Sequence, residues 1–181
     1  MKAIVSLTMA AGLASTGCAQ VTPAAPEPLL HISTSFNLVV RLPYGQATVL
    51  FGPEGERAWA GKHWDPKFIY PQPPNDAEGA VFTVKHGQHN AVWVTSLADV
   101  DARHFQYVYF IPELMVTVID VRFKPVDAGA TAVNVVYTRT AIAPEGNEHV
   151  QAMSEVDKTA GKDWQQSIDE YLARSKAAAR P

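Results

Sequence analysis

The sequence has little cysteine, no dominant charge and no long apolar run, and each of these features narrows the class of protein. A single cysteine, Cys18, among 181 residues leaves no partner for an internal disulfide, so stability must come from a hydrophobic core. The net charge is −3 and lysine and arginine do not cluster, which argues against a nucleic-acid interface. Motifs of the nucleophile elbow, the phosphate-binding loop, the dinucleotide fold and the H-E-x-x-H zinc site are absent, which disfavours the enzymes that depend on them.

The N-terminus has the sequence features expected of a targeting signal. Residues 3–14 are apolar and uncharged, follow Lys2, and are too short to anchor the chain stably in a bilayer. The Ser-Thr-Gly-Cys sequence that ends at Cys18 resembles a bacterial lipobox, in which the cysteine is acylated and becomes the new N-terminus. Cleavage after Ala19 is the alternative. We therefore expect export, either as a lipoprotein on the periplasmic side of a bacterial membrane or as a soluble periplasmic or secreted protein.

The rest of the chain predicts one domain behind a linker. Residues 19–30 contain three prolines and no periodic pattern, which is typical of an extended tether. We expect a signal peptide at residues 1–17, a lipidated tether or linker at 18–32, a single folded domain at 33–175 and a flexible tail at 176–181.

Alternating apolar residues predict one antiparallel sheet. A first strand covers residues 35–41 and ends before Pro43. Six further strands are expected at residues 68–70, 81–85, 91–97, 104–111, 115–124 and 131–141. The short gaps between them require antiparallel neighbours, because a parallel pair needs a long crossover. Alternation also gives the sheet one polar and one apolar face, so another element must cover the apolar face.

Helices are predicted on either side of the six later strands. Residues 44–62 lose the alternation and divide at Gly52-Pro53, which indicates two short helices with Pro53 near the start of the second. Residues 147–174 predict one long helix with Asn147 as its N-cap. Its apolar stripe, with residues at steps of three and four, consists of Val150, Met153, Val156, Ala160, Trp164, Ile168 and Tyr171.

This order of elements resembles the SRPBCC or START-like superfamily (Bet v 1-like, polyketide cyclase-related), in its bacterial branch, over residues 33–174. Two local sequences add to the resemblance: Trp64-Asp65-Pro66 after the helix pair, and the strand end at 137–141 that leads into Pro144-Glu145-Gly146-Asn147. The resemblance implies an α+β helix-grip fold, in which a curved antiparallel sheet of about seven strands wraps around a long C-terminal helix. It also implies a cavity between sheet and helix for a small hydrophobic or amphipathic molecule.

Five residues are candidates for the wall of that cavity. Alternation places Arg139 on the inner face beside Tyr137, where a charge needs a partner, water or a ligand head. The alternative is that its head reaches solvent at the strand end. Tyr107 and Tyr109 share an inner face. They either form part of the cavity wall or belong to an ordinary aromatic core. Met153, together with Val156, is expected to form the cavity floor.

Two histidine arrangements have simpler explanations. The H-x-x-H pair His86 and His89 has no nearby Cys or Glu to complete a metal site, so a solvated hairpin turn is expected. His63, beside Trp64 and Asp65, could act as a general base oriented by Asp65, but adjacent loop residues seldom hold that geometry. We predict no metal and no cofactor.

The sequence thus leaves three functions open. The leading interpretation is a membrane-tethered carrier or sensor of a small hydrophobic or amphipathic molecule, without catalysis. The alternative is a cyclase- or hydrolase-like enzyme that uses the same cavity, since one fold can support varied chemistry. The third is a protein-binding module whose interior is filled.

Overall fold

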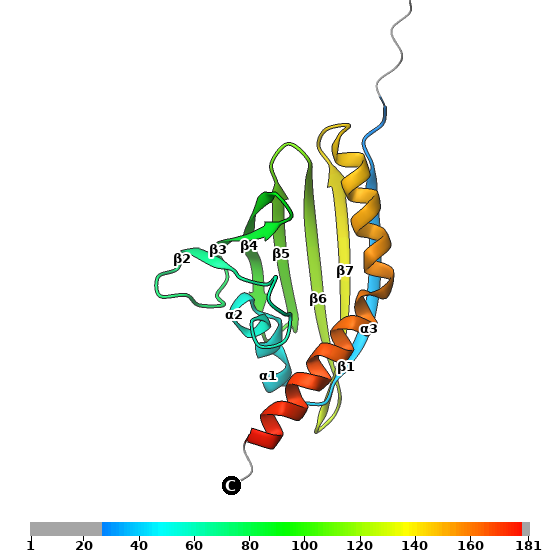
Figure 1. The fold of residues 1–181 in the computed structure, drawn as a ribbon. Helices are drawn as coiled ribbons and strands as arrows, with labels where there is room; N and C mark the ends of the chain where they lie inside the picture. Colours follow the sequence, from blue (N-terminus) through cyan, green and yellow to red (C-terminus); the bar gives the residue numbers. More distant parts are fainter. Residues whose placement is uncertain (1–26, 179–181) are drawn as a thin grey trace, which may run out of the picture.

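The computed structural model describes residues 27–178, which form one sheet, three short helical turns and one long helix (Figure 1). The strands are β1 (His31–Val40), β2 (Lys67–Tyr70), β3 (Val81–His86), β4 (His89–Asp99), β5 (His104–Ile111), β6 (Met115–Asp127) and β7 (Ala130–Ala141). The helices are α1 (Tyr44–Ala47), the 3-10 turn η1 (Thr48–Phe51), α2 (Pro53–Glu56) and α3 (Gly146–Ala178). Cys18 and the predicted signal segment lie outside the described residues.

The seven strands form a single antiparallel sheet in the order β1-β7-β6-β5-β4-β3-β2. Strands β2 to β6 each pair with the next strand along the chain, and β1 pairs with β7 at the other edge of the sheet. The predicted strands and the α+β helix-grip fold are therefore confirmed.

Alternation assigns the two faces of the sheet as predicted. In β7, residues Thr131, Val133, Val135 and Arg139 are buried, whereas the residues between them are half-buried. The outer face is mixed: Asp120 on β6 accepts a hydrogen bond from His104 Nε2 at 2.7 Å, and the cross-strand partners Val94, Val108 and Val118 lie on the same face. We call the face that packs against α3 the inner face.

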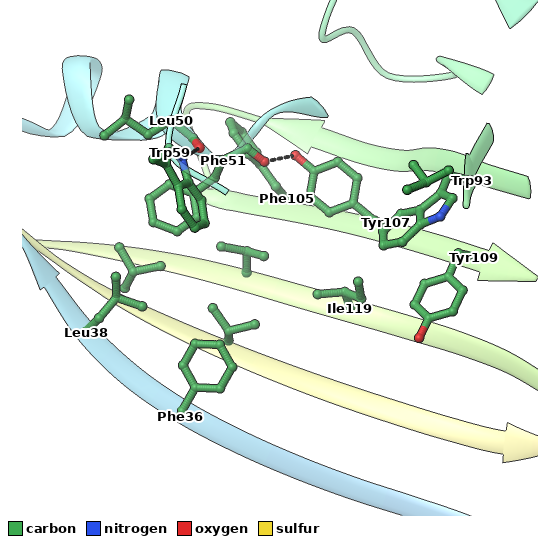
Figure 2. Packing of buried hydrophobic residues seen from close by; sticks show 14 of the residues in the cluster. Phe36, Leu38, Leu50, Phe51, Trp59, Trp93, Phe105, Tyr107, Tyr109 and Ile119 are labelled. Carbon is green, nitrogen blue, oxygen red and sulfur yellow. Dashed lines mark hydrogen bonds between the residues drawn. The ribbon is translucent and has the colours of Figure 1, made fainter. Parts of the chain in front are cut away.

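The two predicted short helices follow β1 and cover part of the inner face. Pro53 is the first residue of α2, as expected from its fixed φ angle. The carboxylate of Asp76 caps this turn, accepting hydrogen bonds from the backbone N–H groups of Glu54 at 2.8 Å and Gly55 at 3.3 Å. Tyr107 then fixes the segment to β5, because its hydroxyl donates to the Phe51 carbonyl at 2.7 Å (Figure 2).

The long helix α3 packs along β1 and β7, with a smaller contact on β6, and its C-terminal half runs toward α1 (Figure 1). Its buried side differs from the predicted stripe at one turn. Val156 is 66% exposed, and the neighbouring Asp157 is buried in its place. The prediction that Val156 lines a cavity floor is therefore wrong, because the helix turns its small and polar residues toward β1.

The start of α3 also differs from the prediction. Asn147 lies inside the helix, which begins at Gly146, and is not its N-cap. Its side chain instead holds the incoming chain: Asn147 Oδ1 accepts from the Leu30 N–H at 2.8 Å, and Asn147 Nδ2 donates to the Pro28 carbonyl at 3.1 Å. The segment before β1 is thus attached to the first turn of α3.

The hydrophobic core lies between the inner face, the short helices and the C-terminal half of α3. Trp164 joins the three: its ring centre lies 5.2 Å from that of Phe36 on β1 and 5.1 Å from that of Trp59 after α2. Phe51 continues the cluster toward Phe123 on β6 at 5.3 Å. Figure 2 shows Phe36, Phe51 and Trp59 of this cluster at one end of the interior.

Candidate functional site

The strand register places the predicted site residues in two adjacent rows across the inner face. Each row consists of residues that are direct cross-strand partners on β4, β5, β6 and β7. The first row is Trp93, Tyr109, Thr117 and Arg139, and the second row is Thr95, Tyr107, Ile119 and Tyr137. Four of the five predicted residues therefore lie side by side, which follows from strand alternation combined with this register.

The fifth predicted residue, Met153, belongs to the part of α3 that covers these rows. The Tyr109 hydroxyl points at Met153 Sδ, 3.9 Å away. Ser154, 3% exposed, and Asp157, 5% exposed, lie on the same buried side of the helix. The helix thus covers the first row with one flexible apolar side chain and two polar ones.

Arg139 does not present a free charge. It is 3% exposed and forms a two-pronged ion pair with Asp157, with Nη1 bonded to Oδ2 and Nη2 at 3.0 Å from Oδ1. Thr34 on β1 donates a further hydrogen bond to Asp157 Oδ2 at 2.6 Å. The guanidinium carbon also lies 4.4 Å from the centre of the Tyr137 ring, in cation–π contact. Burial of two opposite charges in this geometry leaves no net charge at the position.

His86 is half-buried and its Nε2 atom is inaccessible to solvent, whereas a solvated turn was expected. Its ring is stacked on Tyr109, with ring centres 5.2 Å apart, and lies 6.0 Å from Trp93. The pKa of His86 is lowered, first by burial and second by the charge of Arg139, which favours the neutral imidazole. His89 is exposed, and its ring lies 6.0 Å from that of His149 on α3. Sequence reasoning missed His86, although its alternation with Phe82 and Val84 on β3 places it on the inner face of the sheet.

The buried polar atoms without a hydrogen-bond partner all belong to this region. Within residues 27–178 there are six, located on His86, on the two rows and on α3. They are His86 Nε2, Trp93 Nε1, Thr95 Oγ1, Thr117 Oγ1, Arg139 Nε and Ser154 Oγ. An unpaired buried polar group costs about 1–3 kcal/mol unless water or a ligand satisfies it, so this region has room for polar partners from outside the chain.

Glu56 on α2 is a further interior group that sequence reasoning missed. Burial, and next the nearby Asp76, raise the pKa of its carboxyl well above the ordinary value. Its charge acts on the second row, since burial and then Glu56 raise the pKa values of both Tyr107 and Tyr137. Both phenols therefore stay neutral. No sequence pattern marks Glu56, because it lies in a single helical turn.

Two surface depressions lie away from these rows. A groove of about 680 Å³ runs between Phe36 on β1 and Gly161 and Gln165 on α3. A second depression of about 470 Å³ lies beside Lys67 and Lys85. None of the five predicted site residues lines either depression, and the members of the first row, Trp93, Tyr109, Thr117 and Arg139, are all buried.

The general-base arrangement considered for His63 does not form. Asp65 instead bonds to Arg57 Nη1 at 2.9 Å and to Lys67 Nζ at 2.8 Å. Over residues 27–178, no group of three or more His, Cys, Asp or Glu side chains is arranged to hold a metal ion. In the same part of the chain, no helix is both long and apolar enough to span a membrane.

The architecture and the two covered rows define a helix-grip protein of the α+β class. No family model and no curated protein matches the sequence. Solved structures do match at the level of fold. Norcoclaurine synthase from Thalictrum flavum, solved in complex with dopamine and hydroxybenzaldehyde, has a TM-score of 0.57 at 10% identity, over 84% of this chain and 90% of that chain.

Two other solved structures give the same result. Ara h 8.0201 has a TM-score of 0.55 at 15% identity, over 79% of this chain and 99% of that chain. An uncharacterised protein from Rhizobium leguminosarum has a TM-score of 0.56 at 12% identity, over 81% of this chain and 97% of that chain. The chain therefore has the helix-grip fold of these structures, as the sequence resemblance predicted.

Proposed function

We propose that this protein binds a small amphipathic molecule between the inner face of the sheet and α3, as a carrier or sensor. The observation that carries the proposal is the group of six unpartnered buried polar atoms on and around the two rows. Apolar and aromatic side chains surround them, which is the composition expected of a small-molecule site with a few fixed polar groups. Water or the polar head of a ligand would satisfy these atoms.

The fold supports this proposal without fixing the ligand. A structural relative at 10% identity, norcoclaurine synthase, has been solved with two small aromatic molecules. In the present chain the half-buried Met153 provides an adaptable cover over Tyr109, because an unbranched thioether fits varied shapes. Binding is expected to require displacement of this part of α3 from the first row.

Native mass spectrometry of the purified protein tests the proposal. The expected result is a retained small-molecule adduct that Ser154→Leu removes, because the larger side chain fills the space beside the first row. Gln151→Leu, on the exposed side of the same helix, is the matched control and should keep the adduct. An adduct unaffected by Ser154→Leu would place the ligand elsewhere. Absence of any adduct, together with no binding of added apolar molecules, would favour a protein-binding module with a filled interior.

Glu56 favours the enzymatic alternative as the second candidate function. A half-buried carboxyl whose pKa burial raises well above the ordinary value is the kind of group that can act as a general acid or base. If the protein is hydrolase-like, it should cleave nitrophenyl butyrate faster than buffer, and Glu56→Gln should abolish the difference while ligand binding persists. A rate equal to buffer for the unaltered protein would count against this alternative.

We also propose that the protein is exported and tethered to a membrane through Cys18. The apolar segment at residues 3–14 and the Ser-Thr-Gly-Cys sequence support this proposal. In the described chain, Pro28 and Leu30 are held at the start of α3, so the linker would enter the domain at that end.

A further inference from the structure

The charge balance of the interior indicates what kind of ligand head the two rows can accept. Among the described residues, the charged pair of the first row is Arg139 with Asp157, and these two groups neutralise each other within one two-pronged contact. Around this pair, burial raises the pKa values of Tyr107, Tyr109 and Tyr137, so these phenols are neutral, and burial lowers the pKa of His86, which favours the neutral imidazole. A ligand head in the first row therefore meets a neutralised ion pair and neutral rings.

The unpartnered atoms also indicate whether a ligand head should donate or accept hydrogen bonds. Trp93 Nε1 and Arg139 Nε can only donate hydrogen bonds. Both belong to the first row, with Thr117, which can donate or accept, next to Arg139. The permanent hydrogen-bonding groups left open by the protein are thus donors, and their natural partner is an acceptor oxygen.

We propose that the first row recognises ligands with a neutral, acceptor-bearing head, such as a ketone, an aldehyde or an ester, and discriminates against carboxylates and amines. This inference rests on the proposed binding function and replaces the expectation that Arg139 anchors an acidic head. A carboxylate entering the first row would be desolvated beside Asp157 without a free cation to offset the cost. An ammonium group would face the donors of Trp93 and Arg139. A carbonyl oxygen can accept from one of those donors and brings no charge.

The test compares three naphthalene derivatives of similar size: the methyl ketone, the carboxylate and the aminomethyl compound. Binding to the full protein is measured by calorimetry and by fluorescence, since Trp93 lies in the first row. The ketone should bind at least about tenfold more tightly than either charged probe, a difference of about 1.4 kcal/mol. Equal or tighter binding of the carboxylate would overturn the inference while leaving the binding function intact. Binding of none of the three probes would count against the binding function itself.

Two variants test the origin of the discrimination. Thr117→Val keeps the shape of the side chain and removes its hydroxyl, so it should weaken ketone binding several-fold. Ser96→Ala, at an exposed site on β4, is the matched control.

Asp157→Asn removes the negative charge but keeps an oxygen acceptor for Arg139 and Thr34. The preference should then invert toward the carboxylate, because the charge of Arg139 is no longer neutralised. A folded Asp157→Asn protein that still prefers the ketone would contradict the charge-balance argument.

Discussion

At the scale of single residues, the pair of Arg139 and Asp157 determines the electrostatics of the interior. Both groups lose their hydration on folding, and the two-pronged contact, the Thr34 hydroxyl and the Tyr137 ring offset that cost. Alternation in β7 was sufficient to predict that Arg139 lies inside. Its partner was not predictable in the same way, because the apolar stripe on the helix assigned that side to Val156 and a buried carboxylate has no signature in an apolar pattern.

Removing one member of this pair should be more damaging than removing both. Asp157→Ala leaves the Arg139 guanidinium buried without a counter-charge, which should lower the free energy of unfolding by about 3–5 kcal/mol. The double variant Arg139→Met with Asp157→Leu replaces both charges by apolar groups and should be less destabilised than Asp157→Ala alone. Urea denaturation monitored by fluorescence measures both. A loss below about 1 kcal/mol for Asp157→Ala would show that water reaches the pair.

His86 should give the folded protein a stability that decreases in acid. In the unfolded chain this imidazole binds a proton as the pH falls through about 6.5. In the folded protein its pKa is lowered by burial and by Arg139, so the unfolded state takes up protons first and becomes favoured. The contribution is complete above the unfolded pKa and is lost as the pH falls toward the folded pKa.

The measurement is the difference in free energy of unfolding between the unaltered protein and His86→Phe. Between pH values of about 7.5 and 5.5, this difference should move in favour of the variant. A difference measurement is needed because Glu56, whose pKa is raised, changes stability with the opposite sign. His89→Phe, at an exposed position of the same hairpin, is the control. A constant difference for His86→Phe would show that the imidazole is hydrated in the folded state.

At the scale of elements, α3 shows that apolar periodicity predicts the presence of a helix more easily than it predicts which side of the helix packs against the sheet. The stripe correctly indicated a long helix that buries Val150 and Ile168. The close contact with β1, however, is made through a small residue. A Cβ atom on Gly161 would lie 3.0 Å from Phe36 Cβ, so glycine allows the helix to approach the strand. A count of large apolar residues gives no weight to such a position.

Two substitutions on α3 separate the observed contact side from the predicted one. Trp164→Ala removes the indole that joins β1 to the segment after α2, and should lower the free energy of unfolding by about 3 kcal/mol, at the low end for a large aromatic because Trp164 is only half-buried. Val156→Ala should change it by less than about 0.5 kcal/mol, since the side chain is exposed. Thermal and urea denaturation measure both. Similar losses for the two variants would contradict the orientation of the helix.

At the scale of the whole molecule, the order of elements was enough to predict the sheet and its covering helix. Short gaps between strands leave only antiparallel neighbours, and the one apolar face needs a cover. The position of the short helices depends on contacts between residues distant in sequence. The Tyr107 hydroxyl reaches the Phe51 carbonyl, and Trp64 Nε1 donates to the Pro53 carbonyl at 2.8 Å. No local pattern encodes such contacts, so the interior group Glu56 emerged only from the fold.

The tether proposal concerns the molecule as a whole, because it places the binding site beside a membrane. If Cys18 is acylated, cells that express the full chain should incorporate labelled palmitate into the protein, and the protein should sediment with membranes. Cys18→Ser should lose the label and release a folded domain, since the residues of the domain are untouched. Cleavage after Ala19 would instead give an unlabelled soluble protein from the unaltered sequence. Label that persists in Cys18→Ser would show acylation elsewhere and contradict the proposal.

A single acyl chain binds membranes only weakly, so stable sedimentation is expected only if the cysteine carries the several chains of a bacterial lipoprotein. Mass spectrometry of the N-terminal peptide would count those chains directly.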